Sequence, residues 1–358
     1  MPFAVRPRFN WRLRTRTLAL GERTLLMGIL NVTPDSFSDG GRFLAPASAL
    51  QHALAMLDDG ADLLDLGGES TRPGAAPITP AEEQARVLPV LRAILAARPA
   101  TIVSIDTFHA ETARLAVQAG AEIVNDVSGH LWDPAMPSSC AALGCGAILM
   151  HTRGRPHQWR TLPPLAPGEV VPLVLRDLED CVQTALATGI ARESILLDPG
   201  FGFGKILDAN YPLLAHLDQL HTLGFPILAG VSRKSFLTRT LASTLLPSHL
   251  SSRSTAPPLL SSRTLSEQSE SKREGSASST PDPTLLSSRT LASTLLSSHT
   301  AAPLLSSRSG AEGSASSTPD PTTIANTAAI LAGAHILRVH DVRPARQAAA
   351  IADRILNA

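Results

Sequence analysis

Residues 101–126 read TIVSIDTFHAETARLAVQAGAEIVND and carry the pattern of a strand, a helix and a second strand. Each of the two short apolar runs ends in polar residues, the first in Asp106 and the second in Asn125-Asp126. Between them, apolar residues recur at helical spacing over 110–119, and Gly120 is a typical helix stop. Because a helix joins the two strands, we expect them to lie parallel in one sheet. The segment therefore predicts one β-α-β unit.

The same unit repeats along the rest of the chain. Apolar runs occupy residues 25–30, 62–67, 101–106, 121–126, 147–151, 194–198, 226–231 and 335–340. Helical patterns occupy residues 47–59, 81–97, 110–119, 170–188, 210–223, 323–332 and 345–356. Apolar strands that alternate with helices in this way predict an α/β fold of the (β/α)8 type, the TIM barrel. A doubly wound open sheet is the alternative, but it usually places its site at one switch point, whereas polar residues end every strand here.

The first 24 residues precede the first of these strands. Polar and apolar residues alternate over NWRLRTRTLALGERTLL (residues 10–26), which is typical of strands, and Gly21-Glu22 offers a turn. We therefore expect an N-terminal β-hairpin that turns at Gly21-Glu22 and plugs the bottom of the barrel.

Residues 238–322 differ from the rest of the chain in composition. The segment is rich in Ser, Thr, Leu and Pro, contains no aromatic residue, and repeats the strings GSASSTPDPT and RTLASTLL. Such a segment has little apolar surface with which to offset its chain entropy. We therefore expect a long, disordered, low-complexity insertion between strand 7 and helix 7. Residues 1–237 and 323–358 together are then one barrel domain.

The composition excludes several classes of protein. The chain has 358 residues, and Lys+Arg and Asp+Glu both number 31, so its formal net charge is zero. A chain without net positive charge is not expected to be a general binder of polyanions such as nucleic acids. Three cysteines, Cys140, Cys145 and Cys181, are too few for a disulfide scaffold. No apolar run approaches the roughly 18 residues of a membrane span, and no apolar core of a secretory signal follows the arginine-rich N-terminus. We expect a cytoplasmic protein with buried, reduced cysteines and no membrane partner.

Polar residues at the strand ends form two groups. The first group follows strands 3, 4, 6 and 7 and comprises Asp106, Asn125, Asp198 and Lys234. In a barrel these side chains would meet at the carboxyl-end rim, where barrel active sites lie. Carboxylates and an amide suit the N–H edge of a planar ring such as an aminopyrimidine, because a carboxylate accepts two parallel hydrogen bonds. Each aspartate alone could merely cap a helix, but the four residues together favour a ligand floor.

The second group contains side chains that suit a phosphorylated substrate held with Mg2+, namely Asn31, Thr71, Arg338 and His340. Arg338 and His340 are two positions apart in a strand, so both side chains should point to the same face. The glycine-rich stretches that follow the first two strands suit mobile lids over a substrate.

Eight motifs of the chain resemble those of dihydropteroate synthase, an enzyme of folate biosynthesis. They are LLMGILNVTPDSFSDGG, GADLLDLGGESTRPGA, SIDT, IVNDVSG, LMHTRG, LLDPGFGFGK, AGVSRKSF and ILRVHDV. They occur in the family's order, and the resemblance covers nearly the whole chain outside the insertion. The resemblance implies a pterin-binding TIM barrel that is a homodimer and a sulfonamide target. It also implies a transferase that joins p-aminobenzoate to 6-hydroxymethyl-7,8-dihydropterin pyrophosphate.

The resemblance also implies roles for individual residues. Asp106, Asn125, Asp198 and Lys234 would bind the pterin, with Phe203 and Met150 beside it. Asn31 would bind Mg2+, and Thr71, Arg338 and His340 would contact the pyrophosphate. Phe37, Pro73, Lys234 and Ser235 would form the wall for p-aminobenzoate.

The implied mechanism is loss of pyrophosphate followed by attack of the arylamine. The C–O bond to pyrophosphate breaks and leaves a pterin methylene cation, which Asp106 and Asp198 would stabilise. Mg2+, Arg338 and His340 would stabilise the departing pyrophosphate. Lys234 completes the set of residues expected to be catalytic. Because an aniline nitrogen is already unprotonated at neutral pH, we assign no general base.

Two other functions stay open. A methyltransferase that uses a methylated tetrahydrofolate would share the pterin floor, but it would have no need of NVTPDSF or of Arg338-Val-His340. A non-catalytic pterin-binding paralogue could use the insertion as an interaction arm. The insertion and the segment 321–327, PTTIANT, depart from the family pattern. These departures leave the start of helix 7 and the dimer contact open.

Overall fold

The structure is a computed structural model that describes residues 6–33, 41–70, 76–245 and 320–358. Phe37, Thr71 and Pro73, which the sequence assigns to the site, lie outside the described residues. Within the described ranges, no helix is long and apolar enough to cross a membrane.

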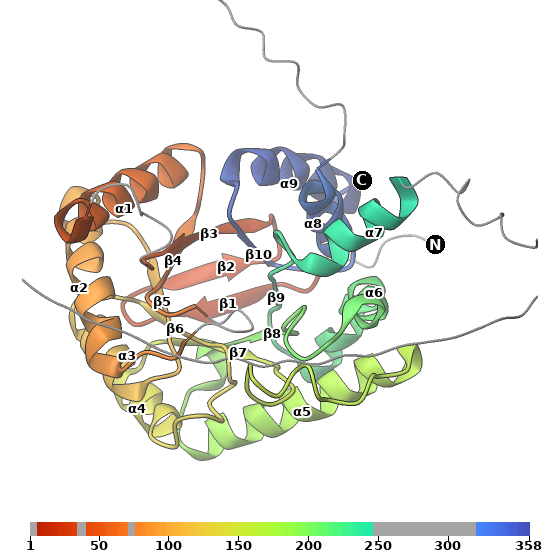
Figure 1. The fold of residues 1–358 in the computed structure, drawn as a ribbon, viewed down its shortest axis with the longest axis horizontal. Helices are drawn as coiled ribbons and strands as arrows, with labels where there is room; N and C mark the ends of the chain where they lie inside the picture. Colours follow the sequence, from red (N-terminus) through yellow and green to blue (C-terminus); the bar gives the residue numbers. More distant parts are fainter. Residues whose placement is uncertain (1–5, 34–40, 71–75, 246–319) are drawn as a thin grey trace, which may run out of the picture. The chain divides into compact units, whose positions relative to one another are not determined.

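Eight parallel strands form a barrel that is ringed by helices (Figure 1). The strands are β3 (Leu25–Asn31), β4 (Leu63–Gly67), β5 (Val103–Asp106), β6 (Ile123–Asp126), β7 (Gly146–Met150), β8 (Ile195–Asp198), β9 (Leu228–Ala229) and β10 (Ile336–Val339). They pair in the order β8-β7-β6-β5-β4-β3-β10-β9. A parallel bridge between Leu197 and Ile227 joins β8 to the segment before β9 and closes the ring. This closure confirms the predicted (β/α)8 barrel and excludes the open, doubly wound sheet.

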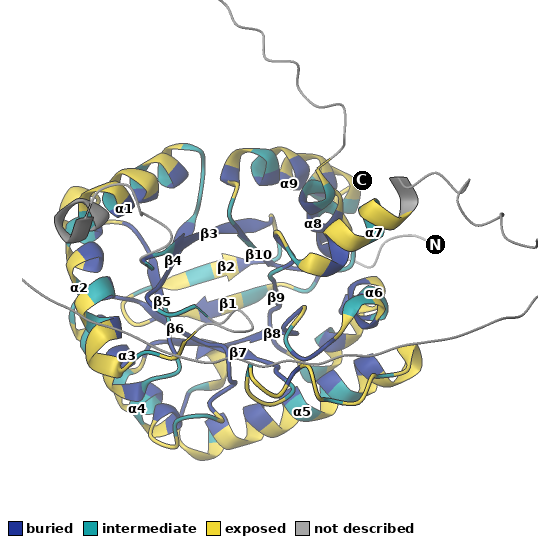
Figure 2. Cartoon of the chain, in the orientation of Figure 1, coloured by how far each residue is buried: buried dark blue, intermediate teal, exposed yellow. Residues whose placement is uncertain are grey.

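Helices connect the strands and turn one buried face toward them (Figure 2). The α-helices are α1 (Gly41–Asp58), α2 (Pro80–Ala97), α3 (Ala110–Gln118), α4 (Met136–Leu143), α5 (Pro167–Ala187), α6 (Asn210–Ala215), α7 (Ser235–Leu245), α8 (Pro321–Leu331) and α9 (Val342–Leu356). Helical turns of the 3-10 type cover Arg192–Ser194, Leu207–Ala209 and Leu217–Leu223. The predicted helix over 210–223 is therefore divided into α6 and a 3-10 segment, which meet at His216.

Local sequence explains where a helix such as α2 begins and which face it buries. Thr79 and Glu82 form a capping box, in which each side chain bonds to the other residue's backbone N–H. These bonds satisfy two of the donors that a helix N-terminus leaves without a partner. Val87, Val90 and Ile94 follow at helical spacing and are fully buried against the barrel.

The core has two layers. In β4, Leu64 and Leu66 belong to the outer layer between strands and helices, whereas Leu63 belongs to the inner layer inside the barrel. This alternation follows from the period of two in a strand. The inner layer also contains Trp11 and Leu13 of the N-terminal segment, so the segment does plug the barrel, as predicted.

The hairpin is made of β1 (Phe9–Arg12) and β2 (Thr17–Leu20), which pair antiparallel. The prediction that it turns at Gly21-Glu22 is wrong. The turn lies at residues 13–16, where the Leu13 N–H donates to Arg16 O at 2.8 Å and the Thr15 N–H donates to Glu122 Oε2 at 2.9 Å. Gly21 instead begins the connection to β3, with φ +108°. A Cβ there would lie 2.4 Å from Pro7 O, so this bend admits only glycine.

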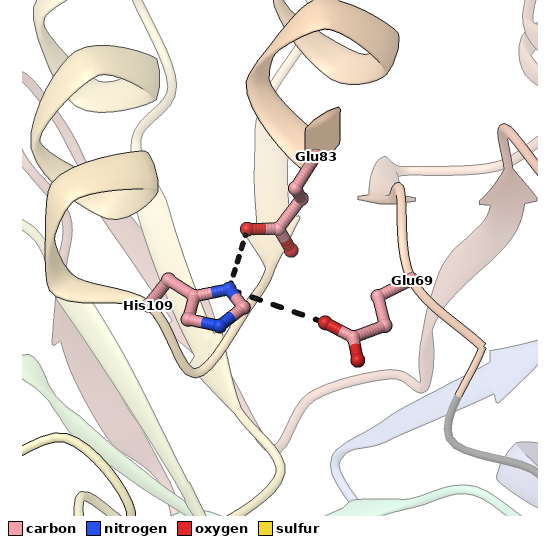
Figure 3. A group of neighbouring side chains, drawn as sticks. All are labelled: Glu69, Glu83 and His109. Atoms are coloured by element: carbon pink, nitrogen blue, oxygen red, sulfur yellow. Dashed lines mark hydrogen bonds and ion pairs between the residues drawn. The ribbon is translucent and has the colours of Figure 1, made fainter. Parts of the chain in front are cut away.

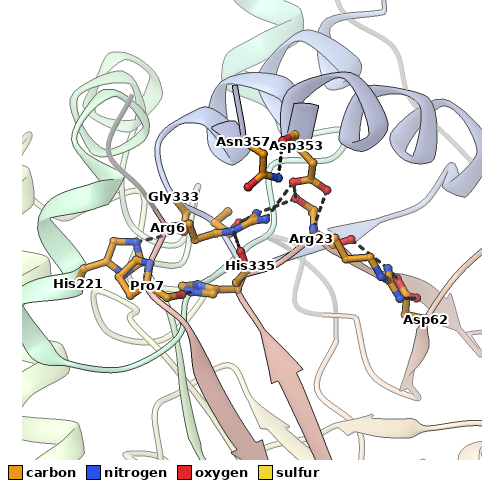
Figure 4. A network of polar contacts seen from close by, with 12 residues as sticks. Arg6, Pro7, Arg23, Asp62, His221, Gly333, His335, Asp353 and Asn357 are labelled. Carbon is orange, nitrogen blue, oxygen red and sulfur yellow. Dashed lines mark hydrogen bonds and ion pairs between the residues drawn. The ribbon is translucent and has the colours of Figure 1, made fainter. Parts of the chain in front are cut away.

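A polar network below the barrel fastens the N-terminal segment to α9 and β10 (Figure 4). Arg6 donates to Ala334 O at 2.7 Å and to Asp353 Oδ1 at 3.0 Å. His335 Nδ1 accepts from the Ile227 N–H at 3.1 Å, so its Nε2–H donates to Pro7 O at 2.9 Å. Burial lowers the pKa of His335 to about 3, and the ring is therefore neutral at physiological pH.

Helices occupy both ends of the predicted insertion. α7 continues to Leu245, and α8 begins at Pro321 with Asp320 as its N-cap. The Asp320 carboxylate accepts from the N–H groups of Thr322 and Thr323, both at 3.1 Å, and so defines the start of this helix. Residues 238–245 and 321–322 thus belong to barrel helices rather than to the insertion. Residues 246–319 lie outside the described part, and their disorder stays a prediction.

Candidate active site

A cavity of about 340 Å³, including its open mouth, lies at the carboxyl ends of the barrel strands. Its lining includes seven of the residues predicted from sequence, namely Asp106, Asn125, Met150, Asp198, Phe203, Lys234 and Arg338. Val127, Phe201, Gly200 and Gly230 complete the wall. The residues come from the ends of β5, β6, β7 and β8, from β10, and from the segments after β6, β8 and β9. The expected convergence of polar strand ends on one rim is therefore observed.

A buried ion-pair network forms the floor of this cavity. Arg338 donates through Nε to Asp65 Oδ2 and through Nη2 to Asp106 Oδ2, both at 2.6 Å. Asn125 Nδ2 also donates to Asp65 Oδ2, at 2.9 Å. Asp65 lies within β4 and is completely buried. Asp65 therefore holds the Asn125 amide and the Arg338 guanidinium in position at the floor of the cavity.

Asp198 also lines this cavity, and the turn after β8 orients it. The Gly200 N–H donates to Asp198 Oδ1 at 2.7 Å. Gly200 has φ +65°, and a Cβ there would lie only 2.0 Å from His151 O, so only glycine fits this turn. Burial raises the pKa of Asp198, whereas the Gly200 hydrogen bond and the positive charge of Lys234 lower it.

Lys234 lies over the ring of Phe203, with Nζ 4.2 Å from the ring centroid. Trp159 packs its edge against the same ring, at a centroid distance of 5.2 Å. This arrangement fixes the ammonium at the cavity wall by a cation–π contact. Burial, together with the charge of Arg338, lowers the pKa of Lys234 to about 8. Lys234 is therefore a cation whose charge is lost at moderately alkaline pH.

Charge of both signs is concentrated on the floor. Asp65, Asp106 and Asp198 supply three carboxylates, and Arg338 and Lys234 supply two cations. Burial, together with the nearby carboxylates, raises the pKa of Asp106, and the Arg338 contact opposes this rise. Arg338, which the sequence assigned to the pyrophosphate, thus reaches into the same cavity as Lys234.

The other predicted site residues lie at the rim or outside the described part. His340 Nδ1 lies 3.0 Å from Ser232 Oγ, and burial lowers its pKa to about 4, so the ring is neutral. Ser235 begins α7 beside Lys234 and is exposed. Neither residue lines the cavity itself. Their predicted contacts with pyrophosphate and p-aminobenzoate stay predictions.

Asn31 ends β3 next to Gly67, its register partner in β4. A Cβ at Gly67 would lie 3.4 Å from Asn31 Oδ1 and 3.5 Å from Asp106 Oδ2. The absence of a side chain at Gly67 thus leaves a space beside two oxygen atoms, one from an amide and one from a carboxylate. Amide and carboxylate oxygens are the ligands that Mg2+ prefers, so the residues present fit the predicted Mg2+ site.

Sequence reasoning missed two buried charged residues. Asp65 interrupts the apolar run of residues 62–67, and a charge inside a buried strand was the available signal. Lys205 is 2% exposed, and its Nζ lies 2.7 Å from His151 Nδ1 and 3.2 Å from Phe203 O. His151 Nε2 lies 3.2 Å from Asp177 Oδ2 in turn. Lys205 therefore fastens the loop that carries Phe203 to the end of β7.

Comparison with known proteins gives one consistent family. The family described as pterin binding enzyme matches residues 27–257. Dihydropteroate synthase of Bacillus subtilis is 43% identical over 224 residues, which are 63% of this chain and 75% of that protein. The Mycobacterium leprae dihydropteroate synthase is 48% identical over 223 residues, 61% of this chain and 75% of that protein.

A solved structure gives the same result. The Xanthomonas albilineans dihydropteroate synthase with 4-aminobenzoic acid superimposes with a TM-score of 0.70 at 31% identity. The match covers 99% of each chain.

Proposed function

This chain belongs to the pterin-binding enzymes and, among them, to the dihydropteroate synthases, and we propose how its residues perform that family's reaction. The chain is thus a transferase. Its reaction joins p-aminobenzoate to 6-hydroxymethyl-7,8-dihydropterin pyrophosphate and yields 7,8-dihydropteroate and pyrophosphate. The Xanthomonas albilineans enzyme is known in complex with 7,8-dihydropteroate, at 30% identity and a TM-score of 0.67, which supports this product.

One observation carries the proposal, namely the buried floor of carboxylates and an amide beside an aromatic wall. Asp198, Asp106 and Asn125 offer acceptors for the N–H edge of a pterin ring. Phe203 and Met150 offer apolar contacts beside the ring plane. Among the described residues, Asn125 Oδ1 is buried without a hydrogen-bond partner, and a ligand N–H would remove the cost of leaving it unpaired.

The charges of the floor suit the bond that breaks. When the C–O bond to pyrophosphate breaks, the electron pair leaves with pyrophosphate and the pterin methylene becomes a cation. Asp106 and Asp198 lie on the floor that the pterin covers and stabilise this developing positive charge. Arg338 keeps Asp106 oriented through its 2.6 Å hydrogen bond. The amine of p-aminobenzoate then attacks the methylene and loses a proton to solvent, so no general base is needed.

Mg2+ would be held by Asn31, whose Oδ1 lies beside Gly67. When bound, the ion supplies charge neutralisation for the pyrophosphate oxygens. His340 and Thr71 belong to the same proposed pyrophosphate subsite, and Arg338 extends it toward the floor.

We place p-aminobenzoate between Lys234, Ser235 and the predicted wall residues Phe37 and Pro73. The Lys234 ammonium, held over the Phe203 ring, attracts the carboxylate of this substrate. A Yersinia pestis dihydropteroate synthase, 32% identical to this chain, is known in complex with a sulfonamide drug. A sulfonamide mimics p-aminobenzoate, so it should raise the apparent KM for p-aminobenzoate and leave kcat unchanged. Inhibition that p-aminobenzoate cannot overcome would contradict this placement.

The test of the function is Mg2+-dependent release of pyrophosphate from the pterin pyrophosphate, measured with and without p-aminobenzoate. Release that requires both substrates supports the synthase. Release without p-aminobenzoate would mean that water traps the pterin cation. Pterin binding without any release would instead identify a non-catalytic paralogue.

We also propose that the chain forms a homodimer in the cytoplasm. Three isoleucines on the neighbouring helices α8 and α9 are exposed: Ile324 by 56%, Ile351 by 64% and Ile355 by 42%. Ile351 and Ile355 are one helical turn apart on α9, and exposed apolar side chains on two contacting helices support a partner surface. Cys140, Cys145 and Cys181 are free and buried, which fits a reducing compartment.

A further inference from the structure

A second cluster of potential ligands lies beside the barrel rim, outside the cavity described above (Figure 3). Glu69 follows the end of β4, Glu83 lies in the first turn of α2, and His109 immediately precedes α3. His109 Nδ1 lies 3.1 Å from Glu83 Oε2 and 4.0 Å from Glu69 Oε2. One ligand atom from each residue lies within 4.8 Å of the others.

Surrounding contacts hold two of these residues in place. Thr107 Oγ1 donates to Glu83 Oε2 at 2.8 Å and accepts from the His109 N–H at 3.1 Å. The His109 ring packs on Phe108, with a centroid distance of 4.3 Å. The imidazole and the Glu83 carboxylate are thus positioned before any ligand arrives, which reduces the cost of binding.

Two carboxylate oxygens of the cluster lack a hydrogen-bond partner. Among the residues that the structure describes, neither Glu69 Oε2 nor Glu83 Oε1 has one, although both atoms are buried. The two side chains are only 9% and 1% exposed. Buried carboxylate oxygens are costly unless they are paired or coordinate a metal. Figure 3 shows the Glu69 carboxylate pointing toward the imidazole, so the unpartnered oxygen faces the centre of the cluster.

The charges around the cluster favour a cation. Asp133 lies close by, and its Oδ2 accepts a hydrogen bond from the Ala110 N–H at 2.8 Å. Arg86 is the neighbouring cation, and its Nη1 donates to Gly68 O at 2.8 Å. Glu69, Glu83 and Asp133 together outnumber the positive charges of Arg86 and a protonated His109.

We propose that Glu69, Glu83 and His109 form a binding site for a divalent metal ion of the zinc class. An imidazole nitrogen with two carboxylate oxygens suits Zn2+ better than Mg2+, which prefers oxygen ligands alone. Ligands at about 2.0–2.1 Å from a tetrahedral ion lie roughly 3.3 Å apart, close to the 3.1 Å between His109 Nδ1 and Glu83 Oε2. Glu69 must approach the imidazole by a small side-chain movement, and water would occupy the fourth position.

The site would be structural. The ion would join the segment that follows β4 to the starts of α2 and α3, which are separate elements of the chain. It is distinct from the proposed Mg2+ site at Asn31, and it does not depend on the proposed reaction.

The experiment measures Zn2+ binding by the full chain after treatment with a chelator, by calorimetry and by the shift in Tm, in excess Mg2+. We expect one Zn2+ per chain at this site and a rise in Tm. Glu69→Gln and His109→Gln should each weaken binding by more than about tenfold, because each removes one of three ligands. The control His216→Gln removes an exposed histidine at the end of α6 and should bind Zn2+ like the parent chain.

Two results would overturn the proposal. One is the absence of a Zn2+-dependent rise in Tm in the parent chain. The other is parent-like Zn2+ affinity in both Glu69→Gln and His109→Gln, which would mean that Zn2+ binds elsewhere on the chain. If His109→Gln does not fold, Glu69→Gln decides the outcome, because Glu69 takes no part in the Thr107 hydrogen bonds.

Discussion

Lys234 is the residue whose replacement tests the site most directly. Its Nζ lies over Phe203 and faces the cavity where p-aminobenzoate is proposed to bind. We expect Lys234→Ala to lower kcat/KM for pyrophosphate release by about 100-fold or more, the usual effect of removing one stabilising group from an active site. The neighbouring Arg233 is exposed and pairs with Asp341, so Arg233→Ala serves as the control and should change kcat/KM little. Equal kcat/KM values for the two variants would show that Lys234 does not contribute to the reaction.

The pKa of Lys234 predicts how activity depends on pH. Burial lowers this pKa to about 8, so the ammonium is charged below pH 8 and neutral above it. Because kcat/KM reports the free enzyme, it should fall as the pH rises through about 8. In Lys234→Arg the cation persists, since the arginine pKa exceeds 12, and the alkaline decline should move to higher pH. A decline that stays near pH 8 in this variant would assign it to another group.

Single residues show how far sequence reasoning reached at the site. Asp106, Asn125 and Asp198 were predictable, because each ends an apolar run and the barrel brings strand ends to one rim. Asp65 and Lys205 were not predicted, since their importance depends on partners far away in sequence. Asp65 pairs with Arg338, which is 273 positions distant. Only the closed barrel brings the two side chains together.

At the scale of elements, the contact between α7 and α8 shows where the insertion can be removed. The two helices contact each other, and they end and begin at Leu245 and Pro321. We expect a chain in which a short Gly/Ser linker replaces residues 246–319 to fold and to keep pyrophosphate release, because the whole cavity lining lies outside that range. The check is the Tm together with kcat/KM of the shortened chain. Loss of folding would show that the segment contributes to the barrel.

The N-terminal hairpin shows the limit of local signals at this scale. Alternation correctly predicted an N-terminal hairpin, but Gly21-Glu22 was mistaken for its turn, and both observed strands precede Gly21. The observed turn at 13–16 contains no glycine, and long-range contacts hold it, such as the bond from Thr15 to Glu122. Glycine marks a sharp bend, but it does not say whether the bend joins two paired strands.

At the scale of the whole molecule, the exposed isoleucines predict how two chains associate. We expect Ile351→Glu to shift the chain from dimer to monomer, because a charge in an apolar contact must lose its hydration. Sedimentation or light scattering would measure the change. The control Ala96→Glu places the same charge at an exposed position of α2 and should leave the dimer intact. A parent-like oligomer in Ile351→Glu would exclude α9 from the interface.

The sequence by itself determined the class of fold, the order of the elements and most of the residues on the pterin floor. These follow from local patterns, namely strand and helix periodicity and polar residues at strand ends. The tertiary structure alone decided which side chains pair across the barrel. It placed Arg338 between Asp65 and Asp106, seated Lys234 on Phe203, and brought Glu69, Glu83 and His109 together. The physical reason is that local periodicity determines the direction of a side chain along its own element, whereas its partner depends on strand register and barrel closure.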